Sequence, residues 1–131
     1  MHSPAFLENY MQRIESPRTD DSAIEQEIKA KGLTAPRVTP ADIERNIRHI
    51  DYVVHVSVGG QVLRWAVITT TNGFAVVGRP SVAVSPQNDD AEIGQKVAKA
   101  NSVNELWPLM GYQLKQRLHE EAVEIGALNL P

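Results

Sequence analysis

Hydrophobic and polar residues alternate through the middle of the chain, and this alternation predicts β-strands. Apolar side chains recur at every second position over residues 51–58, which is typical of a strand with one buried face. A second alternating run covers residues 61–71, a third covers residues 74–77, and a short run at residues 81–84 resumes the pattern. Strands this close together in the chain favour antiparallel pairing. We therefore predict an antiparallel meander of three to four strands.

Short breaks between these runs predict the turns. Gly59-Gly60 and Asn72-Gly73 each favour a two-residue hairpin turn, because glycine and asparagine tolerate a positive φ. Gly78-Arg79-Pro80 predicts a bend in the third strand, since proline cannot donate a hydrogen bond to a neighbouring strand.

Helical periodicity flanks the predicted sheet. Thr39-Pro40-Ala41-Asp42 combines a capping hydroxyl, a proline at the first helical position and a carboxylate in the first turn, and so predicts a helix start. Three isoleucines lie on one face of this helix: Ile43, Ile47 and Ile50. After the strands, apolar residues spaced four apart predict two C-terminal helices, over residues 91–102 and 106–126. The predicted fold class is α+β, a meander with a preceding helix and two C-terminal helices.

The first 38 residues have the pattern of a helical arm followed by a linker. Residues 4–15 and 20–31 each carry apolar positions at helical spacing, and the second segment ends at a glycine. We expect residues 1–38 to form the arm and linker, residues 39–126 the core domain, and residues 127–131 a tail.

Composition narrows the classes of partner. The chain has 131 residues, of which 42% are hydrophobic and 22% charged, with a net charge of −3. An acidic balance argues against coating duplex nucleic acid, because that affinity comes largely from neutralising phosphates. No apolar run approaches the ~20 residues that cross a bilayer, and the first residues lack the pattern of a signal peptide. We expect a cytoplasmic protein without a membrane partner.

The titratable residues point away from catalysis. The chain has no cysteine, and its four histidines never fall at metal-ligand spacing. Three carboxylates, Asp89, Asp90 and Glu92, could form an acidic metal cluster, but capping of a helix N-terminus explains them more simply. No nucleophile elbow or phosphate-binding glycine loop is present. We expect a non-enzyme that uses no cofactor and no metal.

A set of polar and aromatic residues at the ends of predicted elements is the best candidate for ligand binding. Aromatic rings stack on bases, and arginines pair with phosphates. The competing interpretation is that the aromatics belong to the core and the asparagines cap helices. The candidate residues are Phe74, Arg79, Asn88, Asn101, Trp107, Tyr112 and Arg117.

The stretch from Thr39 to Leu118 resembles a known family of small tailed-phage proteins, the gp forty-nine/gene sixty-six family. The most specific matching run is Trp107-Pro108-Leu109-Met110-Gly111-Tyr112. Shorter matches lie at Thr39-Pro40-Ala41-Asp42-Ile43-Glu44, Asn72-Gly73-Phe74, Ser85-Pro86, Asp90-Ala91-Glu92-Ile93-Gly94, Asn101 and Asn104. The chain is also similar to the phage sponges that defeat Thoeris defence by sequestering a cyclic ADP-ribose signal. That similarity implies a pocket near the sheet–helix junction or between protomers.

Three hypotheses follow for the function. The leading one is an anti-defence protein in the host cytoplasm that sequesters a cyclic or ADP-ribose-derived nucleotide second messenger without cleaving it. The second is a protein–protein inhibitor or accessory factor that binds a host enzyme. The third and weakest is a metal-dependent phosphodiesterase that uses Asp89, Asp90 and Glu92. We also expect a homo-oligomer, because the apolar helix and the valine-rich strands offer more surface than one small domain can cover.

Overall fold

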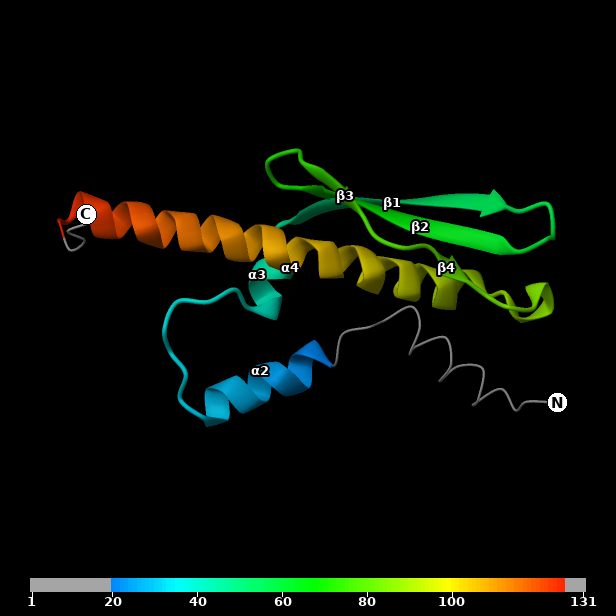
Figure 1. Ribbon diagram of the computed structural model, residues 1–131. Coiled ribbons are helices and arrows are strands. Elements are labelled where there is room, and N and C mark those ends of the chain that lie inside the picture. The colour runs from blue at the N-terminus through cyan, green and yellow to red at the C-terminus, as the bar shows by residue number, and fades with distance from the viewer. Residues whose placement is uncertain (1–19, 127–131) are drawn as a thin grey trace.

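The computed structural model describes residues 20–126, and the predicted helix over residues 4–15 and the predicted tail lie outside this range. The helices are α2 (Asp21–Ala30), α3 (Pro40–Arg45) and α4 (Ala91–Glu124), with a 3-10 turn at Pro86–Asn88. The strands are β1 (Ile47–Val56), β2 (Val62–Thr70), β3 (Ala75–Val77) and β4 (Ser81–Val82). The α+β class and the antiparallel sheet are confirmed, with α4 running along one face of the sheet (Figure 1).

β2 is the central strand of the sheet. It pairs with β1 on one side, where Val53 faces Trp65, and with both β3 and β4 on the other side. Val67 faces Val77 and Leu63 faces Val82, so β3 and β4 form one row that is interrupted at the predicted bend. The expectation that pairing resumes after Pro80 is therefore confirmed.

Both hairpin turns occur where glycine predicts them, although each loop has three residues and not two. Thr70 N–H donates to Phe74 O, and Ser57 N–H donates to Gln61 O, each at 2.8 Å. Within each loop only the third residue has a positive φ. This residue is a glycine in both loops, with φ of +86° at Gly60 and +89° at Gly73. The two-residue turn was predicted because asparagine tolerates positive φ, but no described residue other than glycine has one. A type I turn followed by a left-handed glycine suits a three-residue hairpin.

The helix predicted to carry three isoleucines is shorter than expected. α3 ends at Arg45, and the chain enters β1 at Ile47. A register shift between Ile47 and His49 marks a β-bulge. In a regular strand, residues three apart point to opposite faces, but the bulge lets both Ile47 and Ile50 pack against the core. This spacing imitates helical periodicity, which explains the wrong prediction.

The two predicted C-terminal helices are one continuous helix of 34 residues, with Pro108 inside it. The prediction was wrong because proline in a helix interior costs about 3 kcal/mol relative to alanine, which favours a break. The side chain of Pro108 is exposed, whereas Leu106 is fully buried and Trp107 packs on the core. Packing on the inner face of α4 therefore holds the helix together through the proline.

Small residues bring α4 unusually close to the sheet. Gly94, Ala98 and Ser102 are buried at four-residue spacing along its inner face. The hydroxyl of Ser102 donates to Ala66 O on β2 (2.5 Å) and accepts from Gly78 N–H (2.9 Å) after β3. A Cβ on Gly78 would lie 2.3 Å from Asn101 O, so only glycine fits there. One serine thus links the helix to two rows of the sheet.

The apolar core lies beside this contact, toward the middle of α4. It consists of Ile43 from α3, Ile68, Val76 and Leu106, with Trp107 and Met110 packed at its edge. This core fixes the point at which α4 leaves the sheet, because beyond Met110 no described residue of α4 is buried. The C-terminal half of α4 extends past the end of the sheet (Figure 1).

We expect Gly78→Ala to lower the free energy of unfolding by about 3 kcal/mol or more, because the added methyl group overlaps the backbone of α4. Gly111→Ala is the control. It lies on α4 with nothing within 4 Å of an added Cβ, so it should raise the free energy of unfolding by about 0.5–1 kcal/mol. Urea denaturation of both variants measures the difference, and equal effects would contradict the close contact.

Pro108→Ala should raise the free energy of unfolding by about 1–3 kcal/mol, since it restores a backbone donor inside a continuous helix. Pro40→Ala is the matched control, because Pro40 occupies the first helical position of α3, where its missing N–H costs nothing. Thermal denaturation, monitored by circular dichroism, measures the stability of both variants. A loss of stability in Pro108→Ala would show that the helix is broken there.

Candidate functional site

A cleft of about 840 Å³ lies between α3, the linker before it and the C-terminal half of α4. Its walls come from four separate parts of the chain. The linker and α3 contribute Arg37, Val38, Asp42, Arg45 and Asn46, and the β2–β3 loop contributes Thr71. α4 contributes Met110, Tyr112, Gln113, Leu114, Gln116, Arg117 and Glu120. A volume of this size suits a ligand as large as a nucleotide.

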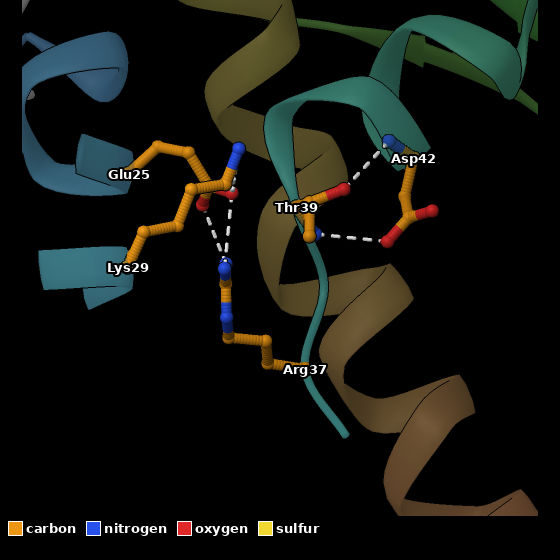
Figure 2. A network of polar contacts seen from close by, with 5 residues as sticks. All are labelled: Glu25, Lys29, Arg37, Thr39 and Asp42. Carbon is orange, nitrogen blue, oxygen red and sulfur yellow. Dashed lines mark hydrogen bonds and ion pairs between the residues drawn. The ribbon is translucent and has the colours of Figure 1, made fainter. Parts of the chain in front are cut away.

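The N-terminus of α3 is held by a capping box. The hydroxyl of Thr39 accepts from Asp42 N–H (3.1 Å), and the carboxylate of Asp42 accepts from Thr39 N–H (2.9 Å), as Figure 2 shows. The backbone hydrogen bond from Thr39 contributes most to lowering the pKa of Asp42 below its ordinary value. At the other end of α3, Asn46 Oδ1 accepts from the Thr71 hydroxyl (2.7 Å). The side of the cleft that α3 forms is therefore anchored at both ends of this helix.

Arg37 connects the linker to α2. Its two terminal nitrogens donate to the two carboxylate oxygens of Glu25 at 2.5 and 3.0 Å, and Lys29 lies 3.7 Å from the same carboxylate (Figure 2). The hydrogen bonds with Arg37 lower the pKa of Glu25, and Glu25 raises the pKa of Arg37. A second, smaller cavity of about 540 Å³ lies on the α2 side of Arg37. The two-point geometry makes Arg37 a structural tie between α2 and the cleft.

The other two arginines of the cleft are held loosely. Arg45 pairs with Asp42 one turn earlier on α3, and Arg117 pairs with Glu121 one turn later on α4 at 3.7 Å. Both arginine side chains are largely exposed. Exposed pairs at this spacing contribute only about 0.3–0.5 kcal/mol, so an incoming anion can replace the carboxylate at little cost.

The remaining lining groups are of two kinds. Val38, Met110 and Leu114 form an apolar floor that is half-buried. Side-chain amides, which both donate and accept hydrogen bonds, surround it at Asn46, Gln113 and Gln116. The cleft thus offers cations, amides and an apolar surface within one volume.

Two of the residues predicted to bind a ligand, Tyr112 and Arg117, line this cleft. Trp107 packs at the edge of the core and Phe74 is exposed at the β2–β3 turn. Arg79 lies at the break between β3 and β4, and Asn88 precedes α4. Along α4, the first helical residue and Arg117 are separated by roughly 39 Å, from a rise of ~1.5 Å per residue. The seven residues therefore do not converge on one site within one protomer.

Asn101 was predicted either to bind a ligand or to cap a helix. It lies inside α4 with 4% of its surface exposed, so it caps nothing, and its Nδ2 donates to Arg79 O at 3.1 Å. Asn88 does not cap α4 either, because Asp90 is the N-cap. Both capping interpretations were wrong: the helix boundary expected near Asn101 does not exist, and Asn88 belongs to the 3-10 turn that comes before the N-cap of α4.

The cleft residues missed from the sequence are mainly Arg37, Arg45 and Asn46. Gln113 could have been found, because Met110, Gln113, Leu114 and Arg117 share a helical face at i, i+3, i+4 and i+7. No local signal marks Arg37 or Arg45, whose positions depend on the path of the linker against α4.

The three carboxylates considered as a metal cluster point to different partners. Asp89 accepts hydrogen bonds from Arg64, Asp90 caps α4 through Ile93 N–H, and Glu92 pairs with Lys96. Capping is therefore confirmed for Asp90. Across residues 20–126, no three histidine or acidic side chains are grouped so as to hold a metal ion. The geometry gives no support to a phosphodiesterase built on these carboxylates.

Arg64 and Asp89 form a largely buried ion pair. Arg64 on β2 reaches both oxygens of Asp89 at 2.5 and 2.8 Å, and the side chains are 10% and 20% exposed. A Cβ on Gly94 would lie 2.9 Å from the guanidinium, so glycine makes room for the arginine under α4. The hydrogen bonds from Arg64 lower the pKa of Asp89, and Asp89 raises the pKa of Arg64.

The fold and the cleft define a small α+β protein in which one long helix backs a three-row sheet and then forms the wall of a ligand-sized cleft. A family model described as the Phage protein (N4 Gp49/phage Sf6 gene 66) family matches residues 38–118, more than half of the chain. The chain belongs to this family of phage proteins. No curated protein and no solved structure gave a significant match. The family resemblance is thus confirmed, and the similarity to Thoeris sponges stays a prediction.

None of the helices among residues 20–126 combines enough length with enough apolar character to span a bilayer.

Asp89→Asn should lower the free energy of unfolding by about 2–4 kcal/mol at pH 7, because it leaves the guanidinium of Arg64 under α4 without its carboxylate. The folded pKa of Asp89 lies below the unfolded value of ~3.9, so its stabilisation is present above that pH and is lost as the pH falls through the folded value. The difference in the free energy of unfolding between the wild type and Asp89→Asn should therefore disappear at acidic pH. Asp90→Asn is the control, since asparagine caps a helix as well as aspartate. A gap that is independent of pH would contradict the ionic origin.

Proposed function

We propose that this phage protein binds a small anionic nucleotide, a cyclic or ADP-ribose-derived immune signal, in the cleft and sequesters it in the host cytoplasm. The observation that carries the proposal is the convergence of Arg37, Arg45 and Arg117 on one cavity from segments far apart in the chain. Phosphate groups are the commonest biological anions that guanidinium groups bind in a two-point geometry.

The phosphate end of the ligand is assigned to Arg45 and Arg117. Their exposed, single-contact ion pairs leave most of each guanidinium free to turn toward an anion. Arg37 keeps its two bonds to Glu25, which compensate its charge, and it holds the wall of the cleft in place. The ligand therefore exchanges one weak carboxylate contact for a stronger phosphate contact at each of two positions.

The base end of the ligand is assigned to the α4 wall. Tyr112 supplies an aromatic ring at the rim for stacking, and Gln113 and Gln116 supply amides that recognise base edges. Leu114 and Met110 form the apolar floor on which a ribose or a base face packs. α4 is a rigid helix, so these groups are held in place before binding, which reduces the loss of conformational entropy.

Binding without cleavage is supported by the engagement of the two carboxylates in the cleft. Asp42 accepts both a capping hydrogen bond and a contact from Arg45. Glu120 accepts a hydrogen bond from Gln116 at 3.0 Å. A general base works best when its pKa lies near the operating pH, and the hydrogen bonds with Thr39 hold the pKa of Asp42 below its ordinary value, which makes Asp42 a weak base.

The second hypothesis, a protein–protein inhibitor of a host enzyme, has its own support. Beyond the sheet, α4 leaves large apolar side chains exposed at Leu109, Val123 and Ile125. An amphipathic helix in a groove is a common mode of recognition. This interpretation places the partner on α4 and requires no nucleotide.

Isothermal titration of the purified protein with a panel of cyclic dinucleotides and ADP-ribose-derived cyclic nucleotides tests the first proposal. We expect one of them to bind, and Arg117→Ala and Arg45→Ala each to weaken it by about 10- to 100-fold through the loss of a charged hydrogen bond. Lys96→Ala, on the first half of α4, should not change the affinity. Ligand released by heating should be chromatographically identical to the ligand added.

Two outcomes would contradict this proposal. If Arg79→Ala weakens binding and Arg117→Ala does not, the nucleotide sits at the sheet–helix junction and not in the cleft. If no nucleotide in the panel gives heat or a thermal shift, sequestration is wrong and the inhibitor hypothesis leads. Affinity capture with Leu109→Arg as the negative control would then test the α4 surface.

A further inference from the structure

β1 is an edge strand whose outer side has no partner strand among residues 20–126. It is 10 residues long and pairs only with β2. Ser57 N–H donates to Gln61 O across the hairpin, so the odd-numbered residues of β1 direct their backbone groups toward β2. The even-numbered residues, Tyr52 and Val54 among them, direct theirs outward. An edge of this length is a template for another strand.

The second half of β1 is also apolar and exposed on both of its faces. Val53 on the open face is 49% exposed, and Val54 and Val56 on the helix face are 55% and 58% exposed. α4 packs on β2, β3 and β4 and does not extend over this part of β1. Edge strands are usually protected by charges, proline or a bulge, but the bulge here lies at the start of the strand, near Arg48.

We propose that a second copy of this chain pairs with it along the outer edge of β1, antiparallel, with Val53 opposite the partner's Val53. The two sheets then become one continuous sheet across a two-fold axis. On the helix face, Tyr52 lies opposite the partner's Val54, and Ile50 lies opposite the partner's Val56. The outward backbone groups of the even-numbered residues pair with each other, and the exposed valines become buried.

Charge complementarity favours this register. Centring the pair on Val53 places Asp51 opposite the partner's His55 on the open face, twice across the axis. Within its own strand Asp51 already lies 2.9 Å from His49 Nε2, so the partner's His55 would extend an existing contact between a carboxylate and an imidazole. Centring on Tyr52 or Val54 places Asp51 opposite the partner's Val53 or Ser57, and centring on Asp51 places two carboxylates opposite each other, which destabilises a strand pair. β1 is thus complementary to an antiparallel copy of itself, as an interface with two-fold symmetry requires.

The chain offers a clean chemical test because it contains no cysteine. In the proposed pair, Val53 occupies a non-hydrogen-bonded position, where the two Cα atoms lie about 4.5 Å apart and a disulfide can form. Val53→Cys under mild oxidation should form a covalent dimer at least roughly tenfold faster than Val77→Cys, a valine of similar exposure on β3. Equal rates for the two variants would overturn the proposal.

A charge exchange tests the register with the full-length chain. Asp51→His should weaken dimerisation by about tenfold in light scattering and analytical ultracentrifugation, because it places histidines opposite each other. The double variant Asp51→His with His55→Asp should restore it by recreating the pair in reverse. A wild-type chain that is monomeric at tens of micromolar, or a double variant no better than the single one, would contradict self-pairing. Either result would leave the edge to a different protein.

Discussion

The arrangement of the molecule depends on the close contact between α4 and the end of β3. At Gly78 the backbones of strand and helix approach so closely that an added Cβ would lie 2.3 Å from a carbonyl oxygen of α4. Ser102 sits at the same point and bonds to Gly78 N–H and to Ala66 O. Two small residues thereby fix the distance between helix and sheet and the direction in which the helix runs. Larger residues at either position would lift α4 off the sheet and leave a buried carbonyl without a donor.

That contact also makes the molecule asymmetric, and the asymmetry explains both surfaces discussed above. Because α4 is centred on β2 and the β3–β4 row, it leaves the far part of β1 uncovered. Because it runs past the end of the sheet (Figure 1), its second half faces α3, the linker and the β2–β3 loop, which line the cleft together with it. The exposed edge of β1 and the half of α4 that lines the cleft are two consequences of one packing geometry.

The sequence predicted the strands and turns well because their signals are local. Alternation and the glycines at 60 and 73 depend on the backbone of a few residues. It failed where tertiary packing overrides local preference. Ile47 and Ile50 imitate a helix because a bulge realigns them, and Pro108 is tolerated because Leu106 beneath it is buried. The residues of the cleft differ in the same way. Arg117 lies on a helix face that the spacing of residues in the sequence predicts. Arg45 reaches the cleft only because the linker and α3 pack beside α4, which no local pattern predicts.

The ion pairs of the cleft bear on what kind of ligand it can hold. Each arginine already has a carboxylate partner, so the proposed binding would be an exchange of anions and not the capture of one by bare cations. In such an exchange a singly charged carboxylate ligand gains little, because it replaces a group like itself. A phosphate presents more charge and more acceptor oxygens in the geometry of the guanidinium fork. The two loosely held arginines therefore favour a ligand with two phosphates, or with one placed between them. Arg37, which is held at two points by Glu25, would keep α2 in place during the proposed exchange.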